Sequence, residues 1–297
     1  MPVEGEPFHD AIPDTWLAAG NAMTYVRGAL LIGLCAFARP IHGQVQWIES
    51  KAPNYTVFYQ AGFESDLAFT RRWMDNAERV MKEKYGVTAQ GYLMSVYLYP
   101  EPADDITLTQ SGQNVCCTSR NGRGVGTLKL LARSAAVWKS GNFKSSLGLP
   151  KEGDDYHAKV LMSEYIPIGH YAVQDARPNG GWKYYDAPNW FVQGLQEYDA
   201  IMYTTDSNRV ATSRRLVDWA KAHKTAFACC APGIRMTDDY NGGATFMAFL
   251  AAVFGEGIHA RLLRSPAATF DAALATETGL TPAALFARLQ QWLEALP

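Results

Sequence analysis

The chain has 297 residues, of which 48% are hydrophobic and 19% charged, and its formal net charge is −2. A chain of this length and apolar content can bury a sizeable core, which excludes an intrinsically disordered protein. It carries no stripe of Lys and Arg interleaved with aromatic residues, so nucleic acid is not expected as a partner. We expect one large globular domain or two closely packed subdomains.

Residues 1–43 are predicted to be an N-terminal extension that contains a secretory signal peptide at 23–43. Arg27 precedes an apolar run from Gly28 to Ala38, and the small residues that end this run suit a cleavage site. The run of about 11 residues is too short to span a bilayer, which requires about 20 helical residues. We therefore expect a secreted or periplasmic protein with no stable transmembrane anchor. A buried helix is the alternative for this run.

Four cysteines follow the predicted signal peptide. Cys116, Cys117, Cys229 and Cys230 form two adjacent pairs, and disulfides persist in exported proteins. One or two bridges between the pairs are expected, because neighbouring cysteines rarely bridge each other without distorting the peptide that joins them. Buried free thiols are the alternative, and the sequence leaves the pairing open.

The first part of the mature chain, at about 45–150, is predicted to form a small sheet with one helix. Alternating residues rich in Tyr, Val and Phe predict strands at 54–60 and 92–100. Between them, residues 64–86 place apolar side chains three and four apart and end at a glycine, as an amphipathic helix does. The glycine-rich residues from 104 to 129 suit short strands joined by tight turns.

The second part, at about 151–297, is predicted to be helical. Helices are expected at 154–176, 187–203 and 207–223, with two or three more between 242 and 296. Thr281 and Pro282 form a good N-cap with proline in the first helical turn. The sequence therefore predicts an α+β fold, in which a small mixed β-sheet is followed by a mainly helical half within one domain at 44–297.

The stretch LMSEYIPIGHY, from Leu161 to Tyr171, has the layout of a zinc-peptidase helix without its histidines. In HExxH peptidases, two histidines four residues apart hold zinc, and the glutamate between them is the general base. The chain resembles the gluzincin-type, peptidase MA-like group of zinc metallopeptidases in three stretches. These are LMSEYIPIGHY, APNWFVQGLQEY and DDYNGGATFMAFLAAVFGEG. The resemblance covers most of the mature chain and implies a metzincin/thermolysin-like architecture.

The resemblance places the three zinc-ligand positions on Ser163, Pro167 and Gln193. Serine and glutamine are poor zinc ligands at neutral pH, and proline offers no side-chain ligand. No cofactor is therefore expected. His170 is the candidate substitute ligand, although it lies about 10 Å along an ideal helix axis from Ser163. Pro167 is also expected to kink the helix between them.

Three other motif residues persist. The resemblance places Glu164 at the general-base position and Glu197 where an acidic residue supports a ligand histidine. Tyr240 lies where a tyrosine donates a hydrogen bond to a tetrahedral oxyanion. For Glu164 and Glu197 the alternative is a structural role, as buried carboxylates held by hydrogen bonds.

The sequence therefore favours an exported pseudopeptidase that has lost zinc and proteolytic activity. Its expected work is to bind a peptide or protein segment in the former active-site cleft. The alternative is an active hydrolase, which uses either zinc held by substitutes such as Glu164, His170 and Glu197, or metal-free acid/base chemistry through Glu164. A structural envelope protein with a vestigial cleft is the third hypothesis.

Overall fold

A computed structural model describes most of the chain from residue 46 onward. The described residues are 46–102, 108–109, 112–113, 125–140, 153–177, 180–230 and 233–296. The predicted signal peptide and the pair of Cys116 and Cys117 lie outside them, so export and bridges between the cysteine pairs stay predictions. The sulfurs of Cys229 and Cys230 lie next to each other.

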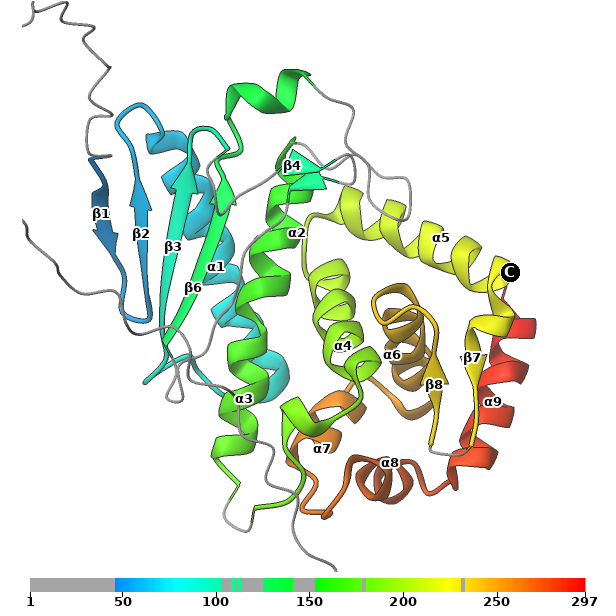
Figure 1. Cartoon of the computed structure of the whole chain (residues 1–297). Helices are drawn as coiled ribbons and strands as arrows, with labels where there is room; N and C mark the ends of the chain where they lie inside the picture. The colour runs from blue at the N-terminus through cyan, green and yellow to red at the C-terminus, as the bar shows by residue number, and fades with distance from the viewer. Residues whose placement is uncertain are drawn as a thin grey trace, which may run out of the picture. The chain divides into compact units, whose positions relative to one another are not determined.

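A four-stranded sheet forms the first part of the described chain (Figure 1). Its strands, in spatial order, are β1 (Ile48–Lys51), β2 (Tyr55–Tyr59), β3 (Leu93–Tyr99) and β6 (Val125–Leu131). β1 is antiparallel to β2, whereas β3 is parallel to both β2 and β6, so the sheet is mixed as expected. The strands at 54–60 and 92–100 are confirmed, and β1 was not predicted.

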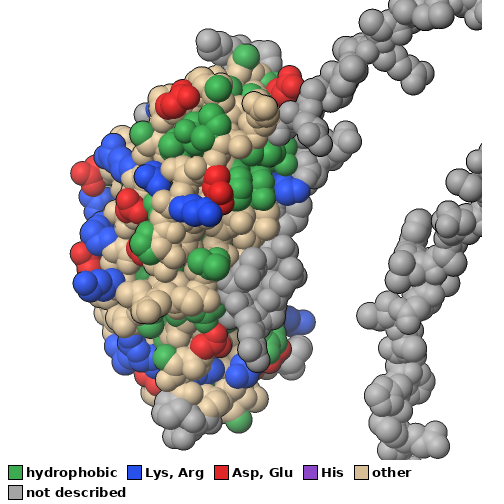
Figure 2. All heavy atoms as spheres, turned by 90° about the vertical axis from the view of Figure 1, so that its left-hand side faces the viewer, with side chains coloured by type: hydrophobic (Ala, Val, Ile, Leu, Met, Phe, Trp, Pro, Cys, Tyr) green, Lys and Arg blue, Asp and Glu red, His purple; other side chains and the backbone are tan. Residues whose placement is uncertain are grey.

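Helix α1 (Glu64–Tyr85) connects β2 to β3 and covers one face of the sheet (Figure 1). It ends at Gly86, whose φ of 64° requires the left-handed conformation that glycine adopts without strain. On the face of the molecule seen in Figure 2, Lys and Arg side chains are interspersed with Asp and Glu side chains. On α1 itself, Arg79 and Glu83 form an exposed ion pair at 2.6 Å, one turn apart, while Trp73, Met74 and Ala77 are buried. The helix predicted at 64–86 is thus confirmed as an amphipathic helix.

The second part of the described chain is mainly helical, which confirms the α+β class. Its helices are α2 (Gly153–Tyr165), α3 (Pro167–Asp175), α4 (Asn189–Met202), α5 (Asp206–Ala222), α6 (Asn241–Phe254), α7 (Ile258–Arg264), α8 (Phe270–Thr278) and α9 (Pro282–Glu294). The two-residue strands are β4 (Leu108–Thr109), β5 (Gly112–Gln113), β7 (Phe227–Ala228) and β8 (Arg235–Met236). The Thr281 hydroxyl accepts a hydrogen bond from the Ala284 N–H at 3.2 Å, as predicted for this N-cap.

One predicted helix is divided in the structure, and the region at 242–296, predicted to form two or three helices, contains the four helices α6, α7, α8 and α9. The helix expected at 154–176 breaks between α2 and α3, because Pro167 has no N–H to donate to the carbonyl of Ser163. The structure thus shows a break in the helix at this proline. The apolar run at 242–264 forms α6 and α7, which are bent by 104° with respect to each other. No single described helix is long and apolar enough to cross a membrane, and α6 with α7 reaches that length and composition only as this bent pair.

The helices α2 and α4 run antiparallel. The hydroxyl of Thr205, just after α4, donates to Asp155 at the start of α2. At the other end, the hydroxyl of Tyr184, just before α4, lies 3.0 Å from Nδ1 of His170 in α3. The end of α4 therefore lies beside the start of α2, and its start lies beside α3.

Helices α4 and α6 cross with their backbones in contact. A Cβ atom added at Gly194 would overlap the backbone of Gly243, and one added at Gly243 would overlap the carbonyl of Trp190. Only glycine fits at either position, because the obstacle is backbone and cannot rotate away. α6 is consequently enclosed in the core, where Phe246, Met247 and other side chains along the helix are buried.

The substitution Gly194→Ala should lower the free energy of unfolding by about 3 kcal/mol or more, because it forces α4 away from α6. Urea unfolding followed by circular dichroism measures the loss. Gly257→Ala is the control, since a Cβ at that exposed position makes only an ordinary contact with Arg261 at 3.5 Å. Equal stability of the two variants would show that the crossing does not constrain the fold.

Candidate functional site

Three of the predicted site residues lie close together. Glu164 is near the end of α2, Glu197 is in the second half of α4, and Tyr240 directly precedes α6. Burial raises the pKa of Tyr240, and the negative charges of Glu197 and Glu164 raise it further. Tyr240 is nevertheless 53% exposed, so this group of side chains is open to solvent on the side of the phenol.

Lys159 is a site residue that the sequence analysis missed. Its ammonium group forms an ion pair with Glu197, and the two side chains are only 25% and 18% exposed. Lys159 lies four residues before Ser163, on the same side of α2 and one turn earlier. That spacing was the signal in the sequence that could have identified it. Lys159, Glu164, Glu197 and Tyr240 are called the α2–α4 site below.

Capping hydrogen bonds at the N-terminus of α6 fix the backbone of Tyr240. A carboxylate oxygen of Asp238 accepts hydrogen bonds from the backbone N–H groups of Tyr240 at 3.0 Å and Asn241 at 2.8 Å. These are N–H groups that have no partner within the helix, so Asp238 caps α6. The side chain of Tyr240 is thereby presented from a fixed backbone position.

The predicted ligand positions do not carry groups that fit zinc. Ser163 is buried, and its hydroxyl donates to the carbonyl of Val160 at 3.0 Å. Pro167 has no side-chain ligand atom, and the half-buried Gln193 offers a neutral amide. Within the described residues, no three His, Cys, Asp or Glu side chains are placed to hold a metal ion together.

His170 belongs to a different group of side chains, which is almost entirely buried. Its Nδ1 lies 3.0 Å from the hydroxyl of Tyr184, and its Nε2 lies 3.1 Å from Oδ2 of Asp199. Asp199 also accepts from Lys84 Nζ at 2.6 Å and from the Tyr85 hydroxyl at 2.5 Å. Both ring nitrogens of His170 are therefore engaged, and this side chain is not available as the substitute zinc ligand. These five residues are called the Asp199 network.

The Asp199 network holds one ion pair and a neutral histidine. Burial alone would raise the pKa of Asp199, but Lys84 and His170 keep it well below its usual range. Burial lowers the pKa of His170 in spite of the neighbouring carboxylate. In this state Nε2–H of His170 donates to Asp199. The hydroxyl of Tyr184, which also lies 3.0 Å from the carbonyl of Val192, can donate to Nδ1.

The chain resembles proteins of known structure only distantly. No family model and no curated protein matches the chain. Among solved structures, the chain is similar to aminopeptidase A of Legionella pneumophila in complex with aspartic acid, with 11% identity and a TM-score of 0.45 over 83% of this chain. The chain spans 28% of the length of that protein. A likeness at this TM-score assigns no function to the chain.

The substitution Asp199→Asn should lower the free energy of unfolding by about 3 to 5 kcal/mol, because it leaves the ammonium of Lys84 buried without a carboxylate. Chemical unfolding measures the loss. Adding Lys84→Met should recover part of it, because the unpaired charge is then removed. Asp206→Asn is the control, since that carboxylate is 93% exposed and its pair with Arg209 lies on the surface. A double variant no more stable than Asp199→Asn alone would contradict the buried ion pair.

Stability should fall as the pH falls below about 6.5, partly through His259. Burial lowers the pKa of His259 to about 3, with the charge of Lys84 acting in the same direction and that of Asp199 opposing it. The pKa of a histidine in the unfolded chain is about 6.5. At pH values between the folded and unfolded pKa values of His259, the unfolded chain binds more protons than the folded chain, so the free energy of unfolding decreases with decreasing pH. At pH 5 the loss from one such histidine is about 2 kcal/mol relative to pH 8.

The variant His259→Gln tests this pH dependence. The Nε2 atom of His259 lies 3.1 Å from the carbonyl of Met247, and a glutamine amide can donate the same hydrogen bond without titrating. Free energies of unfolding measured from pH 8 to pH 5 should therefore decrease less in the variant than in the wild type. An unchanged slope would show that His259 does not titrate on unfolding.

Proposed function

We propose that the chain is an exported pseudopeptidase, in which the α2–α4 site binds a peptide or protein segment and holds no zinc. The proposal follows the resemblance of its motifs to the peptidase MA-like group and the chemistry of the residues at the three ligand positions. Ser163, Pro167 and Gln193 supply a weak hydroxyl, no donor and a neutral amide, none of which retains zinc at neutral pH.

The observation that carries the proposal is the ion pair between Lys159 and Glu197. Because α2 and α4 are antiparallel, one turn forward from Lys159 on α2 corresponds to one turn back from Glu197 on α4. On this register we expect Ser163 to lie level with Gln193, which supports the assignment of both positions to one site. In this pair the positive partner of Glu197 is a side chain of the protein itself. In a metal site, that partner would be a histidine bound to the metal cation.

The sheet offers a place for the bound segment. Among the strands that the structure describes, β6 is the last in the order β1-β2-β3-β6, and it is the edge strand nearest to α2 (Figure 1). An extended peptide can add to a sheet edge through main-chain hydrogen bonds, with alternate side chains directed to the neighbouring surface. A segment paired with β6 would in this way run beside the helix that carries Glu164.

The second candidate function is hydrolysis without a metal. The observation that favours it is the closeness of Glu164 to Tyr240, since a carboxylate near a phenol with a raised pKa is an acid/base pair. In that mechanism Glu164 would take a proton from water, and Tyr240 would donate a hydrogen bond to the oxygen of the attacked carbonyl.

Metal content and peptide cleavage of the mature chain decide between these functions. We expect no stoichiometric zinc by mass spectrometry after purification without a metal-binding tag, and no cleavage of a peptide library. Stoichiometric zinc would overturn the pseudopeptidase. Cleavage that Glu164→Gln abolishes, while Glu49→Gln on the exposed strand β1 preserves it, would establish the metal-free hydrolase instead.

Rebuilding the metal centre tests the register of the two helices. The triple variant Ser163→His, Pro167→His and Gln193→Glu should bind roughly one zinc ion per chain, because it restores two nitrogen ligands and one oxygen ligand. The control variant carries the same two histidines at positions 163 and 167, but its glutamate is introduced by Gln196→Glu instead of Gln193→Glu. The Gln196 side chain hydrogen-bonds Tyr184, so the control should bind no more zinc than the two histidines alone. A folded triple variant that takes up no zinc would show that the three positions do not converge.

A further inference from the structure

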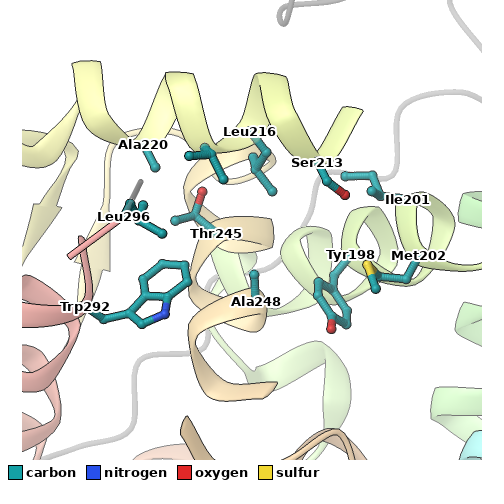
Figure 3. Close-up of a pocket in the computed structure, with 11 residues that line it drawn as sticks. Tyr198, Ile201, Met202, Ser213, Leu216, Ala220, Thr245, Ala248, Trp292 and Leu296 are labelled. Atoms are coloured by element: carbon teal, nitrogen blue, oxygen red, sulfur yellow. The ribbon is translucent and has the colours of Figure 1, made fainter. Parts of the chain in front are cut away.

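A pocket lies among four helices of the second part of the chain, apart from the residues of the α2–α4 site. It has a volume of about 110 Å³ and is lined from α4, α5, α6 and α9. Figure 3 shows Leu216 of α5 above the pocket and Ala248 of α6 between Trp292 and Tyr198. Ile201 and Met202 of α4 complete the side near Tyr198. The lining is thus mainly aliphatic and aromatic.

The polar groups that reach the lining are mostly engaged within the protein. The hydroxyl of Tyr198 donates to Glu256 at 2.9 Å, and that of Thr245 donates to the carbonyl of Asn241 at 2.7 Å. An occupant with buried N–H or C=O groups would leave them without partners, at a cost of about 1 to 3 kcal/mol for each group. This lining therefore favours an occupant without polar groups in the buried part.

The size of the pocket limits the occupant further. A cavity of about 150 Å³ lined by Leu, Ile and Phe stays dry and binds benzene. A volume of about 110 Å³ is somewhat smaller. The pocket differs from such a cavity in that it opens partly to the surface, since Val217, Trp292 and Leu296 in its lining are only half-buried. It accommodates a single ring or a short hydrocarbon chain and is too small for a helix or strand of a protein partner. Burial of such a group is favourable by about 25 cal/mol per Å² of apolar surface.

We propose that this pocket is a binding site for a small apolar molecule, of the class of single-ring aromatic or short-chain aliphatic hydrocarbons. Tyr198 directly follows Glu197 in α4, and successive side chains point about 100° apart around a helix. The pocket and the α2–α4 site therefore occupy different sides of the same helix. The proposal does not depend on whether the chain binds peptides or hydrolyses them.

Benzene is the probe for this site, with pyrazine as a polar ring of similar size. The full mature chain is labelled with ¹³C at its methionine methyl groups, and the signal of Met202 in the pocket reports on binding. We expect benzene to shift this signal saturably and pyrazine to leave it unchanged. No saturable shift with benzene, or an equal shift with both rings, would overturn the proposal. A shift caused by protein concentration alone would indicate a second copy as occupant and would also overturn it.

Two variants that fill the pocket locate the binding. Ala248→Leu places a larger side chain in the pocket from α6, and Ser213→Leu does so from α5. If one of these variants does not fold, the other still tests the site. Each should abolish the saturable benzene shift. Ala252→Leu is the matched control, because Ala252 is exposed one turn further along α6 and should keep wild-type binding. Binding that persists in a folded, filled variant would place benzene elsewhere and refute the site.

Discussion

The buried carboxylate of Asp199 is the constraint on which much of the structure depends. A fully buried charge is stable only when it is paired and its oxygens accept hydrogen bonds. Lys84 and Tyr85 from α1 and His170 from α3 meet this requirement around α4. One side chain thus fixes α4 with respect to both the helix that covers the sheet and the helix that follows α2.

Closely spaced residues of α4 perform different structural tasks. Gly194 allows the close crossing with α6, Asp199 joins α1 and α3, Glu197 pairs with Lys159 of α2, and Tyr198 lines the apolar pocket. A shift of α4 would therefore change the core, the α2–α4 site and the pocket together. The position of Glu197 is set by its ion pair with Lys159 and by the packing of the rest of α4.

The charge balance of the α2–α4 site also differs from that of a metal centre. A zinc ion concentrates two positive charges at one point and needs several ligands in fixed directions. The ammonium of Lys159 carries one charge on a long side chain, is held by a helix backbone and needs only one carboxylate partner. Neither this ion pair nor the glycine crossing of α4 and α6 involves Ser163 or Pro167.

The local pattern of the sequence determined the elements that depend on neighbouring residues: α1 with its terminal glycine, the strands β2 and β3, the proline break after Tyr165 and the Thr281 cap. These follow from side-chain periodicity and backbone geometry, which act over a few residues. The tertiary structure alone decided that His170 pairs with Asp199, that Lys159 reaches Glu197, and that β1 joins the sheet. Such contacts join residues far apart in the chain. Their energies depend on the burial of the side chains and the distances between them, and a local sequence pattern gives neither.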